Sequence, residues 1–500
     1  MVDATRIPVL VGVGQVNDRP EDPSSGLDSL GLMEAALRVA DADAAGGWLR
    51  EIDALAVVAQ ISFPSLRGIA ASLAGRLGIA PALCHETRYP SGDSPTRLLN
   101  EAANRIGAGE SVVAAVAGGE ALQTATRRAA RQRDREGAAV DAVRAASMRA
   151  RPSYAHAYGL TAPVDVYPLY ENALRAALGQ TLAEAQTESG EIWSRLSEVA
   201  ARSPGAWIRR VHTVEEIVTP GPSNRRLAFP YTKLMVANSS VNQGAAFLVT
   251  SLARARARGV PEHRLVYVGL GAAAGEPVDV VARDRYDQSV SLRVTLERAL
   301  ERNALAGHDL DRVELYSCFP CIPKLARRVI DWPLERPVSV FGGLTFGGGP
   351  VGNYMSHALV SMVEALRDGG RHGLLFANGG FATYSHSIVL SRDPERASRF
   401  PQSIDLQSEV DACRGPLPEV APGHVGRGTV ETYTVFHARD GTPRAGVVVA
   451  RSSDGRRFLA HVPPTCPEVL AWLMDPTGEP VGSPGRSVAG PDDLVTWQPA

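Results

Sequence analysis

Several features that would identify a secreted or membrane protein are missing from this chain of 500 residues. It has only five cysteines, without the spacing of a disulfide framework, and its N-terminus lacks the charged and apolar regions of a signal peptide. No apolar run approaches the roughly 18 residues needed to span a bilayer. We therefore expect a cytoplasmic protein with reduced thiols and no membrane association.

An excess of charge of either sign is also absent, because 52 Lys and Arg residues stand against 54 Asp and Glu residues. This balance gives no global attraction to nucleic acid or to an anionic membrane. The hydrophobic content of 44% is enough for large cores, and the length implies more than one domain. Any anionic ligand must therefore be bound by a local group of residues.

The most informative stretch runs from Pro337 to Leu390. Its pattern predicts a buried strand over 337–341, a glycine-rich turn, an amphipathic helix and a hairpin of two strands. The turn contains six glycines: Gly342, Gly343, Gly347, Gly348, Gly349 and Gly352. So many glycines imply unusual backbone angles and the close approach of another backbone or a ligand, so we expect a site there.

Strands alternate with helices over the first 120 residues, which predicts parallel sheets covered on both faces. The same order of strands and helices then recurs, at a nearly constant distance along the sequence. Three pairs of anchors carry the repeat: Val11 to Gly14 with Val268 to Gly271, Phe63-Pro64 with Phe319-Pro320, and Gly119 with Gly380. We infer two copies of one β/α half-domain.

Two regions interrupt or follow the repeat. Residues 122–230 form an irregular excursion that begins rich in Arg and Ala, and we interpret it as solvated helices rather than as a cap whose arginines meet phosphates. After about residue 400, short strands separated by Asp440-Gly441 and Asp454-Gly455 predict a small antiparallel β-barrel. The expected domains are 1–260, including the excursion, then 261–400 and 405–500.

Four stretches together resemble the thiolase superfamily, from about residue 6 to 395. GGLTFGGGPVG at 342–352 and ANSSVNQGAAFLV at 237–249 are similar to its glycine-rich and pantetheine-contact stretches. VELYSCF at 313–319 resembles thiolases of the sterol-carrier-protein type, and YPSGDSPTRLL at 89–99 resembles the helix that carries the nucleophile. The resemblance implies the α/β thiolase fold, with duplicated βαβαβαββ halves layered α-β-α-β-α. It also implies a homodimer, with a monomer as the alternative.

The catalytic side chains of thiolases are replaced in this sequence. Their chemistry needs a thiolate that takes the acyl group, a histidine that activates it and a second cysteine that moves the α-proton. By the resemblance these positions hold Tyr89, Gly349 and Ala377, and Tyr316 stands at the first oxyanion-hole position. A phenol is largely protonated at neutral pH and is a poor acyl acceptor. We therefore expect no ordinary thiolase activity from this degenerate site.

The resemblance also implies that residues for binding persist. Ser239 stands at the pantetheine-contact position, the small residues Ser240 and Gly244 leave space for a tunnel, and Asn378 can present a backbone N–H. We expect the protein to bind an acyl-CoA or a related thioester as a ligand, in lipid or acyl metabolism, with no cofactor. For Ser239 the alternative is a hydroxyl that caps a local turn.

A first alternative keeps the protein an enzyme. Cys318 and Cys321 form a C-x-x-C at an expected helix start, where the helix dipole lowers a thiol pKa. Cys318 is therefore a candidate nucleophile for an acyltransferase or thioester hydrolase, although structural cysteines are the favoured interpretation. No second C-x-x-C pair is present, so no metal is expected. His357 and His386 are interpreted as satisfied structural histidines.

A second alternative lies in the C-terminal stretch, which resembles the OB-type domains that accompany thiolase-like proteins. Such barrels also bind single-stranded nucleic acid through aromatic platforms in a basic groove, so an adaptor for nucleic acid or protein is conceivable. The candidate side chains are Tyr433, Phe436, Arg439, Arg451, Arg456 and Arg457. Nucleic acid is not the favoured partner, because aromatic residues on strands are more often part of a core.

Overall fold

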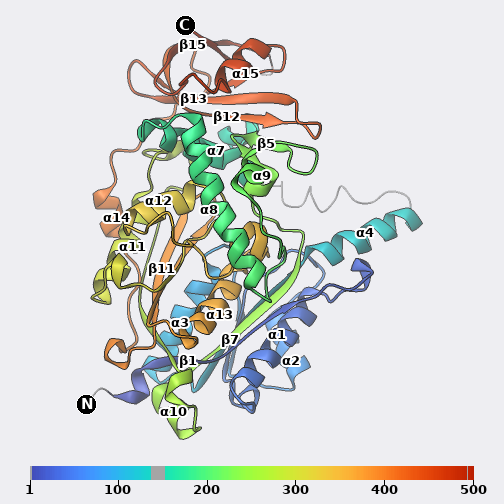
Figure 1. Cartoon of the computed structure of the whole chain (residues 1–500), viewed down its shortest axis with the longest axis vertical. Helices are drawn as coiled ribbons and strands as arrows, with labels where there is room; N and C mark the ends of the chain where they lie inside the picture. Colours follow the sequence, from blue (N-terminus) through green and yellow to red (C-terminus); the bar gives the residue numbers. More distant parts are fainter. Residues whose placement is uncertain (1–2, 137–152, 492–493) are drawn as a thin grey trace.

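The computed structural model describes residues 3–136, 153–491 and 494–500, so part of the expected excursion, at 137–152, lies outside the described residues. Figure 1 shows an α/β body with a β-barrel above it. Among the helices described, none has the length and apolar character that crossing a membrane requires.

The N-terminal half contributes five strands to the main sheet in the order β3-β2-β4-β7-β1. Strand β2 is parallel to β3 and β4, as expected, whereas β7 runs antiparallel to β4 and β1. The elements are β1 (Pro8–Asn17), α1 (Ser29–Asp43), β2 (Ala54–Val57), α2 (Ile69–Leu77), β3 (Leu83–Glu86), α3 (Ser94–Ala108), β4 (Val113–Ala121), β7 (Asn242–Ser251) and the short α10 (Leu252–Ala257).

The C-terminal half repeats this plan and adds strands in the order β8-β11-β10-β9. Its elements are β8 (Val266–Gly275), α11 (Val290–Arg302), β9 (Arg312–Glu314), α12 (Cys321–Val329), α13 (Tyr354–Arg367), β10 (His372–Gly379) and β11 (Tyr384–Ser391). The first strands of the two halves pair through Val9 with Tyr267 and Leu10 with Val266, which joins all nine strands into one sheet. The inferred duplication is confirmed.

The strand expected over 337–341 does not form. The hydroxyl of Ser339 accepts hydrogen bonds from the backbone N–H groups of residues 341, 342 and 343, so the chain folds into a turn at the end of this stretch. The glycine-rich turn follows as a single π-helical turn (Gly343–Gly347), and the glycines on either side, Gly342 and Gly348, have φ of 103° and 107°. The helix and the hairpin after it form as expected, as α13 and β10–β11.

The helices produce the expected α-β-α-β-α layering. Helices α1 and α2 share a separate core with the outer face of the N-terminal strands, and α11 packs on β8 and β11. Helices α3 and α13 pack against each other and against strands of both halves, and they lie side by side in the middle of the body (Figure 1). The two central helices therefore bring their N-terminal ends, which carry the thiolase-like motifs, into one region.

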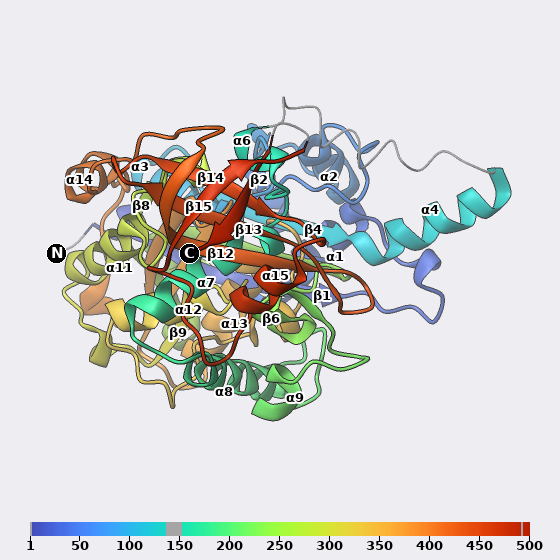
Figure 2. The same ribbon diagram turned by 90° about the horizontal axis from the view of Figure 1, so that it is seen from above.

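The interpretation of the excursion as solvated helices is correct for its first helix and wrong for the rest. Helix α4 (Leu122–Glu136) projects from the body in both views (Figures 1 and 2). By contrast α7 (Pro163–Ala177) and α8 (Leu182–Arg202) bury Tyr167, Tyr170 and Trp193 in the main core. The short helices α6 (Tyr154–Ala157) and α9 (Val214–Val218) flank them.

The C-terminal region forms a closed barrel of five strands in the order β12-β13-β14-β16-β15, in which β15 pairs back to β12. This is the Greek-key OB arrangement, with one parallel pair, β14 and β16. The elements are α14 (Gln407–Cys413), β12 (Gly426–His437), β13 (Pro443–Ser452), β14 (Arg457–Val462), α15 (Pro467–Leu473), β15 (Pro484–Ala489) and β16 (Val495–Pro499). From the excursion, β5 (Arg226–Phe229) pairs with β12, and β6 (Tyr231–Thr232) pairs with β5.

A buried arginine connects this barrel to the α/β body. Arg457 is fully buried, and its guanidinium donates to the Glu431 carboxylate at 2.5 and 2.7 Å. The same guanidinium donates to the Val281 carbonyl at 2.9 Å and to the Arg283 carbonyl. Buried charges are tolerated only when they are paired in this way, so the barrel is fixed to the segment at 281–284.

Replacing Arg457 by alanine is expected to destabilise the protein by about 1–3 kcal/mol, because it leaves the buried carbonyls of Val281 and Arg283 without this donor and leaves the Glu431 carboxylate with Arg451 as its remaining partner. The matched control is Arg456→Ala, since Arg456 is an exposed neighbour paired with exposed Asp454, and little change is expected there. Urea denaturation measures the free energy of unfolding of both variants. Equal stability of the two would contradict the connecting role of Arg457.

Candidate functional site

The turn before α3 is where the thiolase-like positions converge. A Cβ atom added to Gly92 would lie 2.0 Å from the Tyr316 hydroxyl oxygen and 2.1 Å from the Asn378 carbonyl oxygen. A Cβ atom on Gly352 would lie 2.5 Å from that of Pro90. Because neither glycine has room for a methyl group, the turn packs directly against three other segments. These segments contain residues 316–318, 349–352 and 377–380.

Tyr89 occupies the nucleophile position but points away from this convergence. Its side chain is 51% exposed, and its hydroxyl lies 3.4 Å from the hydroxyl of Tyr384. A side chain at this position that faces solvent cannot contact the groups packed against Gly92. The phenol is therefore not placed as an acyl acceptor.

Tyr316 fills the interior of the site. It is 7% exposed and has a φ of 50°, which is uncommon for a residue other than glycine. Its ring packs edge-on against Tyr354, with ring centroids 5.7 Å apart. Burial raises the pKa of its hydroxyl well above the ordinary value, so it stays a neutral phenol.

Cys318 is buried behind the turn. Burial raises the pKa of its thiol to about 12, opposite to the lowering expected at a helix start, and α12 begins only at Cys321. The Asn378 side chain donates to the Tyr167 hydroxyl at 2.8 Å and lies 3.8 Å from the Cys318 sulfur. Burial also raises the pKa of Cys321. Neither thiol is available as a thiolate nucleophile at neutral pH.

The glycine-rich turn contacts the segment expected to bind pantetheine. The N–H of Gly349 donates to the Asn238 carbonyl at 2.8 Å, and the N–H of Asn238 donates to the Leu344 carbonyl at 3.0 Å. Ser239 and Ser240 follow and are exposed. The short turn at 238–240 is capped by Asn238, whose Oδ1 accepts a hydrogen bond from the Ser240 N–H at 3.2 Å. Among the described residues nothing bonds the Ser239 hydroxyl, so it is not the cap of this turn.

Two other predicted positions have packing roles. A Cβ atom on Gly244 would lie 2.6 Å from the Leu32 carbonyl oxygen of α1, so this glycine faces the outer helix layer and not the glycine-rich turn. The neighbouring Gln243 faces that turn and donates to the Gly347 carbonyl at 2.8 Å. Gly244 is therefore corrected to a packing residue, because side chains alternate along β7. Ala377 is buried on β10 opposite His386.

Two adjoining cavities open on the exposed side of the turn. One of about 280 Å³ is lined by Tyr89 and Ser91, and one of about 580 Å³ is lined by Glu276 and Arg414. They share Asp93, Arg97 and Tyr384. Asp93 is buried, which raises the pKa of its carboxyl, and it accepts a hydrogen bond from the Ser91 hydroxyl. These cavities lie outside the wall formed by Gly92 and Tyr316.

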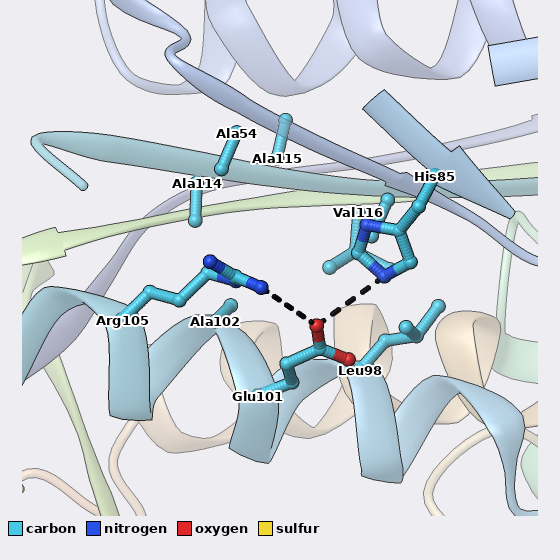
Figure 3. A pocket seen from close by; sticks show the side chains of 10 residues that line it. Ala54, His85, Leu98, Glu101, Ala102, Arg105, Ala114, Ala115 and Val116 are labelled. Carbon is cyan, nitrogen blue, oxygen red and sulfur yellow. Dashed lines mark hydrogen bonds and ion pairs between the residues drawn. The ribbon is translucent and has the colours of Figure 1, made fainter. Parts of the chain in front are cut away.

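A separate gap of about 10 Å³, large enough for about one water molecule, lies between α3 and the strands and shares His85, Leu98 and Glu101 with the smaller cavity (Figure 3). His85 and Arg105 point toward Glu101 across this gap, each with a nitrogen 3.4 Å from the carboxylate oxygen. His85 first, and then Arg105, lower the pKa of Glu101. The cluster ties β3 to α3 and so fixes the turn between them.

The two histidines near the site are buried but only partly satisfied, which corrects the sequence interpretation. His357 Nδ1 lies 3.1 Å from Gln15 Oε1, while its Nε2 and both nitrogens of His386 have no partner among the described residues. Burial lowers the pKa of both imidazoles to about 3. They are neutral at physiological pH and are not placed as bases for a nucleophile.

A family model and several solved structures match this chain. The model of the thiolase-like protein type 1 additional C-terminal domain matches residues 405–486. A monomeric SCP2-thiolase like protein type 1 from Mycobacterium smegmatis is 30% identical, with a TM-score of 0.83 and 100% of both chains covered. The chain belongs to the thiolase-like proteins of type 1.

Two more distant structures share the fold of this thiolase-like protein. An Ltp2-ChsH2(DUF35) aldolase has a TM-score of 0.58 and 18% identity over 78% of this chain and 99% of its own. The human mitochondrial 3-ketoacyl-CoA thiolase in complex with CoA has a TM-score of 0.56 and 15% identity over 78% of this chain and 98% of its own. No curated protein matches the sequence.

Residues that the sequence interpretation missed hold the site of this thiolase-like protein together. Tyr167 on α7 donates to the Gly380 carbonyl at 3.1 Å, accepts from the Asn378 side chain, and stacks on Phe319 with centroids 4.4 Å apart. Because Tyr167 lies far from Asn378 in the sequence, no local sequence pattern could reveal their contact. Asp93 carries a weak signal, an acidic residue directly before a helix.

We expect exposed cysteines to be alkylated faster than buried ones. Iodoacetamide at pH 8 should modify exposed Cys413 first, and Cys318 and Cys321 only after unfolding, because burial keeps both thiols protonated. Peptide mass spectrometry over time measures each site. Modification of Cys318 in the folded protein as fast as that of Cys413 would show a reactive thiol and restore it as a nucleophile.

A buried carboxyl beside Tyr316 predicts a pH dependence of stability. Glu314 accepts hydrogen bonds from Ser339 at 2.6 Å and Tyr354 at 2.9 Å, and burial raises its pKa from 4.5 to about 7. The protonated form is therefore favoured by folding, so its contribution is complete below about pH 4.5 and is lost as the pH rises through about 7.

Glu314→Gln should therefore be more stable than the parent protein at pH 8, relative to their difference at pH 5, as measured by urea midpoints. Exposed Glu86→Gln is the control and should follow the parent at both pH values. A Glu314→Gln variant whose stability relative to the parent is the same at both pH values would refute this assignment.

Proposed function

We propose that this protein binds an acyl-CoA or a related thioester in lipid or acyl metabolism without carrying out the ordinary thiolase reaction. The observation that carries the proposal is the turn at Gly92. The segments that resemble thiolase motifs meet there with no room for a methyl group, while the side chains around the turn offer no activated nucleophile. A scaffold kept without its chemistry is suited to binding.

The binding part of the proposal is supported by the segment at Ser239. The hydroxyl of Ser239 is exposed and has no partner among the described residues. Ser239 directly follows Asn238, whose backbone is hydrogen-bonded to the glycine-rich turn. Pantetheine carries amide groups that bond to hydroxyl and backbone groups. A protein of the same fold, the human mitochondrial thiolase, is in complex with CoA, which agrees with a ligand of this class.

The absence of thiolase chemistry is supported by three side chains. Tyr89 faces solvent, Tyr316 is a buried neutral phenol, and Cys318 is a buried protonated thiol. The alternative in which Cys318 acts as nucleophile of an acyltransferase or hydrolase therefore needs a conformation different from this one. Nothing in the geometry of Cys318 favours it.

The adaptor alternative also lacks support in the barrel. Tyr433 and Phe436 are buried, so they form no exposed platform for stacking bases. Arg457 is buried, and Arg451 and Arg456 pair with carboxylates at 3.0 and 2.8 Å. We propose instead that the barrel stabilises the α/β body.

The remaining expectations are part of the same proposal. We propose that domains at 1–260, 261–400 and 405–500 act as one cytoplasmic unit. The resemblance to thiolases implied a homodimer or a monomer. The relative from Mycobacterium smegmatis is monomeric, which favours a monomer here.

A bulky side chain at Ser239 is expected to block the bound thioester. In calorimetric titrations with acetyl-CoA and a medium-chain acyl-CoA, Ser239→Trp should weaken binding at least about tenfold, or about 1.4 kcal/mol. Ser72→Trp is the matched control, because Ser72 is an exposed serine on α2 in the outer helix layer. Absence of binding to the parent protein, or equal binding by both variants, would contradict the proposed site.

A further inference from the structure

The cavity of about 580 Å³ beside the Gly92 turn has no part in the proposed thioester contact. Its walls come from the start of α3, the end of β8 with the loop that follows it, the start of β11, and residues 404–414, which include α14. The last wall lies at the start of the region that the type 1 C-terminal domain model matches. The cavity is therefore completed by an element that the two thiolase-like halves do not supply.

Hydrogen bonds fix this last wall to the end of β8. The Gln407 side chain accepts from the Gly275 N–H at 2.8 Å and donates to the Gly275 carbonyl at 3.0 Å. Arg414 donates to the same carbonyl at 2.8 Å and to the Glu276 carboxylate at 3.0 Å. Glu276 is buried and also accepts from the Ser291 N–H at 2.7 Å. The shape of the cavity is therefore set by paired polar groups.

The residues that line the cavity carry more negative than positive charge. Four carboxyl groups stand against two guanidinium groups: Asp93, Glu276, Asp405 and Asp411 against Arg97 and Arg414. Arg414 alone serves both Glu276 and Asp411, at 3.0 and 2.5 Å. Asp405 accepts only from the Gln407 N–H within the described residues. Exposed Asp405 and Asp411, called the rim carboxylates below, therefore leave a local excess of negative charge that favours a cationic ligand.

Asp93 supplies a buried acceptor that faces the same cavity. It is 4% exposed, and its Oδ1 accepts from the Ser91 hydroxyl. No residue of the described chain donates a hydrogen bond to Oδ2, because Arg97 Nη1 lies 3.8 Å away, beyond hydrogen-bond distance. Burial raises the pKa of this carboxyl, so a cationic donor at Oδ2 would offset the cost of burying its charge. A buried carboxyl oxygen without a donor in a cavity wall indicates a donor on the ligand.

Asp93 and the rim carboxylates are at opposite ends of the cavity. A Cβ atom on Gly379, at the end of β10, would lie 2.7 Å from Asp93 Oδ1. Gly379 pairs with Tyr384 of β11, Tyr384 pairs with Gly275 of β8, and Gly275 bonds Gln407. The two ends are therefore two strand spacings apart, or about 10 Å. Much of the remaining lining is aliphatic, from Ala273, Ala274, Pro277, Val278 and Ile404.

We propose that this cavity binds an aliphatic diamine. One ammonium group donates to Asp93, the other donates to the rim carboxylates, and the methylene chain lies along the aliphatic lining. A metal ion is not the favoured cation, because the described residues contain no group of three or more His, Cys, Asp or Glu side chains that could hold one. The inference goes beyond the proposed function, since the lining includes no residue of the glycine-rich turn or of the segment at Ser239.

The test is a calorimetric titration with 1,5-diaminopentane. Asp93→Asn keeps the shape of the side chain and should weaken binding at least about tenfold, because it removes a charged acceptor. The double variant Asp405→Asn/Asp411→Asn should weaken it about two- to fivefold, because the rim is exposed. Glu409→Gln is the matched control on α14. Glu409 pairs with Arg298 at 2.6 Å, does not line the cavity, and its variant should bind like the parent.

Arg97 distinguishes a cationic ligand from an anionic one. Its exposed guanidinium competes with an ammonium group for Asp93, so Arg97→Gln should bind the diamine more tightly than the parent. Pentanedioate, a dicarboxylate with the same number of carbons, should not bind. Binding of pentanedioate that Arg97→Gln weakens would show an anion site and overturn the proposal. It is also overturned if the parent does not bind the diamine, or if Asp93→Asn and the double rim variant both bind it like the parent.

Discussion

The contact at Gly92 is the constraint on which the rest of the site depends. Two segments meet the turn there with no room for one methyl group, since a Cβ atom would lie 2.0 Å from the Tyr316 hydroxyl and 2.1 Å from the Asn378 carbonyl, and a third segment meets the same turn where Gly352 packs on Pro90. The central helices α3 and α13 have to pack against each other for this contact to form. The buried ring of Tyr316 therefore fills the space beside this turn.

The barrel and the excursion reinforce this constraint from outside. Arg457 of the barrel bonds the carbonyls of Val281 and Arg283, and Arg283 in turn donates to the Ala382 carbonyl at 2.8 Å. Helix α7 reaches the same hairpin tip through Tyr167 and Tyr170. The tip follows Asn378, so a chain of hydrogen bonds runs from the barrel to the wall of the site.

Much of the fold could be predicted from the sequence, because the duplicated anchors and the hairpin turns at Gly441 and Gly455 are local signals. The irregular backbone at 337–341 could not, since its apolar pattern does not reveal that the hydroxyl of Ser339 bonds the N–H groups of residues 341–343 and folds the chain into a turn. Gly244 was assigned to the wrong face because its motif gives no direction along β7. The contacts of Tyr167 with Asn378 and Gly380 join residues far apart in sequence, and no spacing within one segment reveals them.

The account is tested most directly by incubating the protein with saturating acetyl-CoA and measuring bound ligand and intact protein mass in the same sample. It predicts occupied sites, an unchanged protein mass and an intact thioester after hours. A mass increase of one acetyl group, located on Cys318 or Tyr89 by peptide analysis, would show a covalent acyl-enzyme and contradict the claim that a thiolase scaffold is kept here for binding alone.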